Sequence, residues 1–383
     1  MDPVLAERQL ADVLENFVGR HRNLLSTFEL RASEMEAAFA PHANLNTTQR
    51  RLIGAYFLHE YAFESAALFN PSIVRHPDQA GAPAGGYRFI LSLRAVGEGH
   101  ISSLTFRSGF VDHAGNVTVE PTARLASVPH INKRIAHAEG DTVDVVFAGE
   151  TDISERVIFP ITDAQSNGIE DARFVAFEDA GRCTYYATYT AYSGRAIRSE
   201  LIETKDFLSF RMTPLSGSAT RNKGMGLFPR RINGRYAMIA RQDNENLFLV
   251  YSDDLYIWSG GQPILKPEYP WEFVQIGNCG SPIELDEGWL LLTHGVGPVR
   301  RYAIGAVLLD KADPSKVIGR SPEPLVRPEP SEREGYVPNV VYTCGGMRHR
   351  DMIVLPYAIS DTYSNFATLR ISDLLGSLAM KLP

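Results

Sequence analysis

The stretch from Gly168 to Tyr192 reads GIEDARFVAFEDAGRCTYYATYTAY, and we interpret the rest of the chain outward from it. Residues 174–177 and 183–192 are rich in aromatic and β-branched side chains, which favour strands. An acidic segment that contains Gly181 separates the two runs. Two such runs on either side of a glycine-containing turn predict a β-hairpin.

The start of this hairpin carries a cluster of charges, formed by Glu170, Asp171 and Arg173. Neighbouring charges can shift the proton affinity of a carboxylate in either direction, which makes the cluster a candidate catalytic site. A surface ion pair at a strand end would have the same sequence and would contribute little to stability. The residues alone leave both interpretations open.

The overall composition narrows the class of protein. The chain has 383 residues, with 38 basic and 45 acidic side chains and a net charge of −7. This balance argues against nucleic acid or an anionic membrane as the main partner. No apolar run has the roughly 18 residues of a membrane-spanning helix, and the first residues do not resemble a secretory signal. Three scattered cysteines are typical of reduced thiols, so we expect a cytoplasmic protein.

Residues 1–69 are predicted to form an N-terminal helical extension. Apolar side chains recur near the helical period after Pro3, and residues 46–49 resemble a capping box. The pair Asn70-Pro71 is predicted to stop the last helix. Such an extension could join copies of the chain into a homo-oligomer or close over a pocket.

The sequence pattern changes near residue 70, and residues 70–383 are predicted to form an all-β domain. Short apolar or aromatic runs recur between glycine, proline, aspartate and asparagine. Residues 204–210 (TKDFLSF) are echoed 48 positions later by residues 252–258 (SDDLYIW). A period near 48 is typical of the blades of a β-propeller, and the length allows about five or six of them. Equivalent strands of a propeller line its central channel, so the polar strand ends Arg241, His294 and Asp361 are expected around one pocket with Asp171.

The motif Gly-x-Glu-Asp-x-Arg, followed by a Tyr-Thr-Ala-Tyr strand, resembles the signature of glycoside hydrolase family 130, which contains β-mannoside phosphorylases and β-mannosidases. The resemblance implies a five-bladed β-propeller and an inverting phosphorylase that forms α-mannose 1-phosphate. Asp171 would be the general acid and would act through a sugar hydroxyl. Phosphate would be bound by Lys223, Arg241, His294, Tyr302 and Ser103. The mannoside would be bound by Arg94, Glu170, Arg173, Tyr192 and Asp361.

Phosphorolysis needs an unusual mixture of groups. Phosphate is already an anionic nucleophile, so it needs cations and hydrogen-bond donors rather than a base. One acid then protonates the leaving oxygen, whereas hydrolysis needs a second carboxylate to activate water. The sequence contains no zinc, dinucleotide or P-loop motif, and we expect no metal and no cofactor beyond inorganic phosphate as co-substrate.

The chain departs from the family pattern around residues 275–280. Gln275 stands where the phosphorylases of the family usually have a lysine, and Asn278-Cys279-Gly280 replaces Gly-Ala-Gly. A β-mannosidase that uses water is therefore the first alternative, with the nearby Glu272 or Glu284 as base. A non-catalytic sugar-binding propeller is the second alternative. The acceptor sugar and the linkage stay open, because loops decide both.

Overall fold

The computed structural model describes residues 2–35 and 44–380. The chain forms two compact units, one of residues 1–62 and 123–126 and the other of residues 63–122 and 127–383. Within the described ranges, no helix combines the length and the apolar character that a membrane span requires.

In the part of the first unit that the structure describes, the helices are α1 (Pro3–Phe17), α2 (Leu24–Met35) and α3 (Thr47–Tyr56). The predicted capping box is confirmed, because the Asn46 side chain accepts from Gln49 N and the Gln49 side chain accepts from Asn46 N. The prediction that Asn70-Pro71 stops the last helix is wrong: α3 ends at Tyr56, and both residues lie in a strand. Long-range strand pairing overrides the helical pattern there.

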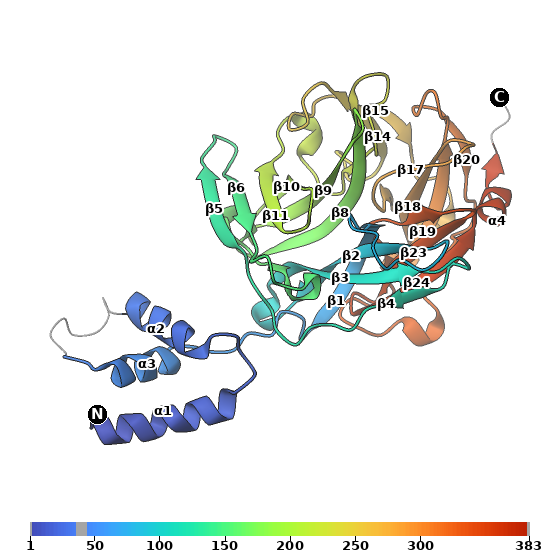
Figure 1. Cartoon of the computed structure of the whole chain (residues 1–383). Coiled ribbons are helices and arrows are strands. Elements are labelled where there is room, and N and C mark those ends of the chain that lie inside the picture. The colour runs from blue at the N-terminus through green and yellow to red at the C-terminus, as the bar shows by residue number, and fades with distance from the viewer. Residues whose placement is uncertain (1, 36–43, 381–383) are drawn as a thin grey trace. The chain divides into compact units, whose positions relative to one another are not determined.

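The second unit is mostly β-sheet (Figure 1), and its described residues form four sheets. We divide the first sheet, of eleven strands, at the parallel bridge between Ser102 and Gly168, which gives five sets of otherwise antiparallel strands. The first set contains β1 (Ala67–Arg75), β2 (Tyr87–Val96), β3 (Ser102–Val111) and β4 (Val117–Val119), and β7 (Val157–Ile158) pairs with β3. The second contains β8 (Gly168–Asp179), β9 (Arg182–Tyr192), β10 (Ile197–Thr204) and β11 (Ser209–Pro214), extended by β6 (Thr142–Val146) and β5 (His130–Ile135).

The remaining three sets follow in chain order. The third contains β12 (Gly226–Leu227), β13 (Tyr236–Ala240), β14 (Leu247–Ser252) and β15 (Gln262–Leu265). The fourth contains β16 (Gln275–Asn278), β17 (Ile283–Glu284), β18 (Trp289–Gly297), β19 (Arg301–Leu309), β20 (Val317–Arg320) and β25 (Ala379–Met380). The fifth contains β21 (Val341–Tyr342), β22 (Met347–His349), β23 (Met352–Ile359) and β24 (Tyr363–Arg370), and is followed by the helix α4 (Ile371–Gly376).

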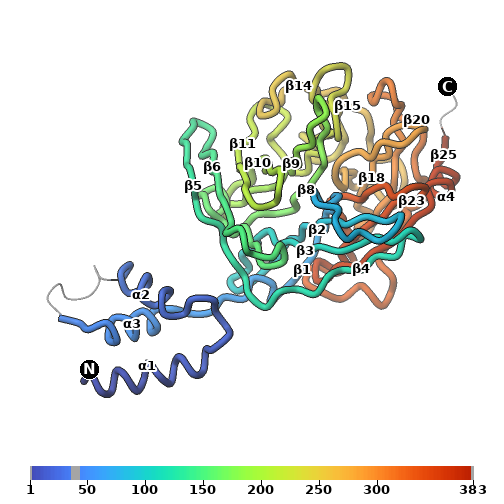
Figure 2. The backbone as a smooth tube through the Cα atoms, viewed as in Figure 1, coloured from blue at the N-terminus to red at the C-terminus, as the bar shows by residue number. Residues whose placement is uncertain are grey.

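Neighbouring sets contact one another, and the fifth returns to the first. Ser102 pairs with Gly168 between the first two sets, and Tyr302 forms a bridge to Val340 between the last two. Leu68 N donates to Thr362 O, so β1 lies beside the strands near the C-terminus, as the tube in Figure 2 shows. The all-β prediction is confirmed for this unit, whereas the count of five propeller blades stays a prediction.

Two kinds of turn repeat between the sets. The echo at residues 204–210 and 252–258 is structural, since both segments leave the third strand of a set and lead toward the fourth. The turns at Glu98–His100 and Pro298–Arg300 also match, because both have positive φ at their last two residues. As β2 and β18 lead into these turns at equivalent positions, Arg94 and His294 occupy equivalent places in the two sets.

The core lies between the sheets. Between the first two sets, Phe106 packs edge to face against Phe174 and Phe207. Each such burial stabilises the fold by about 1.5–3 kcal/mol. These packed sheets fix the positions of the polar residues at the ends of their strands.

Candidate active site

Asp171 lies in a β-bulge of β8. The pairing with β9 shifts between Glu170 and Arg173, and Asp171 has a φ of 52°. A bulge bends a strand and redirects a side chain, and a left-handed conformation at a residue other than glycine is costly and clusters at functional sites. Asp171 is only 7% exposed, so its carboxylate is buried within the sheet and is not a solvated surface charge.

Asn70 holds the Asp171 carboxylate from the neighbouring set. Its Nδ2 donates to Asp171 Oδ1 at 2.7 Å, and both residues are buried. Asn70 also has a positive φ, 50°, in a region of β1 where the register with β2 shifts. The sequence analysis missed this residue because it interpreted Asn70-Pro71 as a helix stop.

Three cations surround the two adjacent carboxylates. Arg94 donates to Glu170 Oε1 at 2.7 Å and lies 3.5 Å from Asp171 Oδ1, and the Lys223 Nζ lies 3.4 Å from Glu170 Oε2. Arg173 Nη1 donates to the Asp171 backbone oxygen at 2.8 Å. Burial raises the pKa of Asp171, but Arg94, Lys223 and Arg173 outweigh this effect and lower the pKa to about 2.

Tyr342 supports the arginine at the centre of this group. Arg173 Nη2 donates to the Tyr342 hydroxyl at 2.7 Å, and both side chains are buried. Tyr342 also packs against His294, with ring centroids 4.9 Å apart. Sequence reasoning missed Tyr342, because its partner Arg173 lies 169 positions away in the chain.

Arg241, a cation, and His294 form a second polar pair of the site. Arg241 Nη1 lies 3.1 Å from His294 Nε2, and the His294 ring stacks on Tyr302 with centroids 5.7 Å apart. Burial, together with the positive charges of Arg241 and Arg173, lowers the pKa of His294 well below its usual value, so its imidazole is neutral. The charge of Asp171 raises the pKa of both residues, in opposition to burial.

Asp361 completes the group. Burial and the charge of Asp171 raise its pKa to about 6, although Arg94, Arg300 and Lys223 act in the opposite direction. Asp361 has a φ of 49°. The site therefore contains two nearby carboxyl groups whose environments push their pKa values apart, which is typical of acid–base sites.

Two predicted residues have no contact with this group among the described residues. Ser103 of β3 pairs with Ala95 of β2, so their side chains share one face of the sheet. The side chain of Arg94, the residue before Ala95, lies on the other face. Tyr192 donates its hydroxyl to the Gly194 backbone oxygen at 3.3 Å. The structure does not bring these two together with Asp171.

The glutamates proposed as hydrolytic bases are both held by arginines elsewhere. Glu272 is fully buried, pairs with Arg320 and accepts from the backbone N of Tyr269 at 3.1 Å. Glu284 accepts two hydrogen bonds from Arg230, at 2.9 and 2.8 Å. Neither carboxylate has a contact with Asp171 or His294 in the part of the chain that the structure describes.

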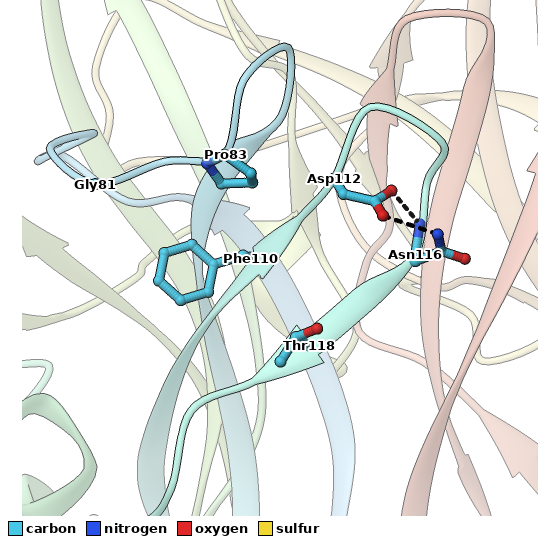
Figure 3. A pocket seen from close by; sticks show the side chains of 6 residues that line it. All are labelled: Gly81, Pro83, Phe110, Asp112, Asn116 and Thr118. Carbon is cyan, nitrogen blue, oxygen red and sulfur yellow. Dashed lines mark hydrogen bonds between the residues drawn. The ribbon is translucent and has the colours of Figure 1, made fainter.

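A cavity and the arrangement of metal-ligating side chains also bear on possible binding sites. A cavity of about 300 Å³ lies at Gly81, Pro83, Phe110, Asp112, Asn116 and Thr118 (Figure 3). Its carboxylate, Asp112, is already hydrogen-bonded to the Asn116 side chain and backbone, and no cation lines this cavity. Among residues 2–35 and 44–380, no group of three or more His, Cys, Asp or Glu side chains has the arrangement of a metal site.

Comparisons with known proteins bear on this geometry. A family model described as beta-1,4-mannooligosaccharide phosphorylase matches residues 144–379. A 1,2-beta-oligomannan phosphorylase of Thermoanaerobacter sp. is 37% identical over 218 residues, which cover 56% of this chain and 72% of that protein. A beta-1,2-mannobiose phosphorylase of Listeria innocua is 32% identical over 235 residues, 58% and 64% of the two chains. The solved structure of Beta-1,2-Mannobiose phosphorylase from Listeria innocua, in complex with beta-1,2-mannobiose, has a TM-score of 0.60 at 24% identity, over 84% of this chain and 94% of that one.

Proposed function

The chain belongs to glycoside hydrolase family 130, and from this premise we propose that it is an inverting β-mannoside phosphorylase. It would cleave a β-mannosyl disaccharide or oligosaccharide with inorganic phosphate and release α-mannose 1-phosphate. The observation that carries the proposal is the buried Asp171 carboxylate among Arg94, Lys223 and Arg173, together with Arg241, whose Nη1 lies 3.1 Å from the neutral His294. Such a site suits an anionic nucleophile and one acid.

The reaction needs one bond to form and one to break. A phosphate oxygen attacks the anomeric carbon of the mannosyl group, the bond to the leaving oxygen breaks, and that oxygen takes a proton. We assign this proton to Asp171, relayed through a sugar hydroxyl. Lys223, Arg241, His294 and Tyr302 form the phosphate side of the site.

The low pKa of Asp171 is compatible with this role. Its pKa of about 2 describes a carboxylate among cations that have no phosphate beside them. A bound phosphate dianion places negative charge next to Arg241 and Lys223, and a like charge near a carboxylate raises its pKa. Proton uptake by Asp171 would then accompany the binding of phosphate, and the acid would form only in the complete complex.

We assign the remaining substrate contacts to the sugar side. Arg94, Glu170, Arg173 and Asp361 hold the mannosyl group, and no role is assigned to Tyr192 or Ser103. Residues 70–383 would be the catalytic domain. The return of the fifth set to the first, through Leu68 and Thr362, supports a closed five-bladed propeller. Residues 1–69 would join copies of the chain, and we place the enzyme in the cytoplasm.

A β-mannosidase is the second candidate, and Gln275 is the feature that favours it. The test is sugar release from β-1,2- and β-1,4-mannobiose and from mannosyl-glucose, with and without phosphate. Mannose 1-phosphate that appears only with phosphate supports the phosphorylase; free mannose at equal rates in both conditions identifies the hydrolase. Asp171→Asn is expected to abolish turnover and, because cations lower the pKa of Asp171, to reduce the melting temperature at neutral pH without preventing folding. Retained turnover would contradict its role as acid. Sugar binding without turnover by the unaltered protein would identify a non-catalytic propeller.

A further inference from the structure

The imidazole of His294 has a partner at each ring nitrogen. Arg241 Nη1 lies 3.1 Å from Nε2, and the Cys279 Sγ lies 3.8 Å from Nδ1. Arginine has only N–H donors, so Nε2 must accept and cannot carry a proton. In a neutral ring the proton is then on Nδ1, where it donates to the sulfur of Cys279.

The surroundings prevent the ring from turning over. A Cβ atom at Gly277 would lie 2.3 Å from Cε1 of His294, so the ring fills the space that any larger residue would take. Tyr302 and Tyr342 pack against the ring, with centroids 5.7 and 4.9 Å away. A half-turn would also direct a C–H group at the guanidinium of Arg241, because it exchanges the places of Nε2 and Cε1.

We infer that Cys279 is a positioning residue for phosphate binding: its sulfur accepts the Nδ1 proton of His294, so that Nε2 accepts from Arg241 and orients the guanidinium. The inference rests on the proposed function, in which Arg241 binds phosphate. The Nε of Arg241 is buried and has no hydrogen-bond partner in the described ranges. An arginine binds an oxyanion with paired N–H groups, so anchoring Nη1 on His294 leaves the opposite edge for phosphate. His294 then contributes by holding Arg241 and not by donating a proton to phosphate.

The test compares Cys279→Ala and Cys279→Ser with the unaltered full-length protein. Cys344→Ala is the matched control, since it removes another fully buried thiol and no hydrogen bond joins Cys344 Sγ to a histidine of the described chain. The first readout is the kinetics of phosphorolysis: KM for phosphate, KM for the mannoside, and kcat. The second is the tautomer of His294, observed by long-range ¹H–¹⁵N NMR of ¹⁵N-histidine-labelled protein. The signal of His294 is identified by its loss in His294→Gln.

We expect the unaltered protein to show the tautomer protonated at Nδ1. Cys279→Ala should add the other tautomer and raise KM for phosphate about 5-fold, the effect of one ordinary hydrogen bond, with a smaller change in KM for the mannoside. Cys279→Ser should restore both readouts, because a hydroxyl also accepts. Cys344→Ala should lower the melting temperature without changing KM for phosphate.

Two results would overturn the inference. One is an Nε2–H tautomer in the unaltered protein. The other is a Cys279→Ala variant whose KM for phosphate stays unchanged, or changes no more than in Cys344→Ala. If the unaltered protein shows no phosphate-dependent turnover, the proposed function fails, and the NMR tautomer still decides whether Cys279 positions His294.

Discussion

Replacing Asp361 by asparagine is expected to make the protein more stable at neutral pH while impairing catalysis. In the folded protein, burial and the charge of Asp171 raise the pKa of Asp361 from 3.8 to about 6. Its ionised form is therefore disfavoured by folding, so Asp361 destabilises the protein above pH 4, and most strongly above pH 6. Asparagine has the same shape as the protonated acid and carries no charge, so it removes this destabilisation.

The size of the effect follows from the shift. A change from 3.8 to about 6 corresponds to about 3 kcal/mol at most, at 1.36 kcal/mol per unit of pKa. Asp361 is partly exposed, and solvent screening reduces the expected gain to about 1–3 kcal/mol. For a domain of this size, the melting temperature should rise by roughly 2–5 °C at pH 7.5. At pH 4 both forms are neutral in the folded protein, and the gain should nearly vanish.

Thermal unfolding of the unaltered protein and Asp361→Asn at pH 4.0 and pH 7.5 measures this directly. Asp253→Asn is the control, because Asp253 is 84% exposed and pairs only with Arg235, so its replacement should change stability by less than about 0.5 kcal/mol. A melting temperature that falls at pH 7.5, or that rises equally at both pH values, would refute the reasoning. KM for the mannoside should rise in Asp361→Asn, since this residue is assigned to the sugar.

Three further substitutions test other contacts of the site. Asn70→Ala removes the 2.7 Å hydrogen bond to Asp171. A hydrogen bond to a charged group contributes about 1.5–3 kcal/mol, so kcat/KM should fall roughly 10-fold or more. An unchanged kcat/KM would exclude Asn70 from the mechanism. Gly277→Ala places a methyl group 2.3 Å from Cε1 of His294, which is a steric overlap. The displaced ring should raise KM for phosphate and lower the melting temperature. An unchanged KM for phosphate would show that the His294 ring has room to move. Glu284→Gln weakens only a partly exposed ion pair and should leave turnover intact, whereas a large loss of kcat at unchanged stability would identify Glu284 as a hydrolytic base.

Local sequence signals predicted the parts of this structure that local physics determines. The hairpin of β8 and β9 follows from two β-rich runs around a glycine-containing turn. The echo between residues 204–210 and 252–258 identified equivalent turns, because each needs a short polar side chain to accept backbone N–H groups. The capping box at Asn46 was also visible, since both of its partners lie within one helical turn.

Contacts between distant segments explain what the sequence could not show. Asn70 and Asp171 meet across 101 positions, and Arg173 and Tyr342 across 169. No periodicity in either segment signals the partner. The pair Asn70-Pro71 also has the composition of a helix stop, and only the pairing of β1 with the rest of the sheet assigns Asn70 to the site.

The five sets of strands also make activity a late property of folding. Each set supplies part of the site: Arg94 comes from the first, Asp171 from the second, Arg241 from the end of a strand in the third, His294 from the fourth and Asp361 from the fifth. Contacts between residues so far apart in the chain form slowly, because the intervening chain must first be ordered. A polypeptide that lacks only the strands of the fifth set and the residues after them would already contain most of its secondary structure but not a whole site. During refolding, circular dichroism should therefore recover before turnover, and a nascent chain should stay inactive until its last strands have left the ribosome.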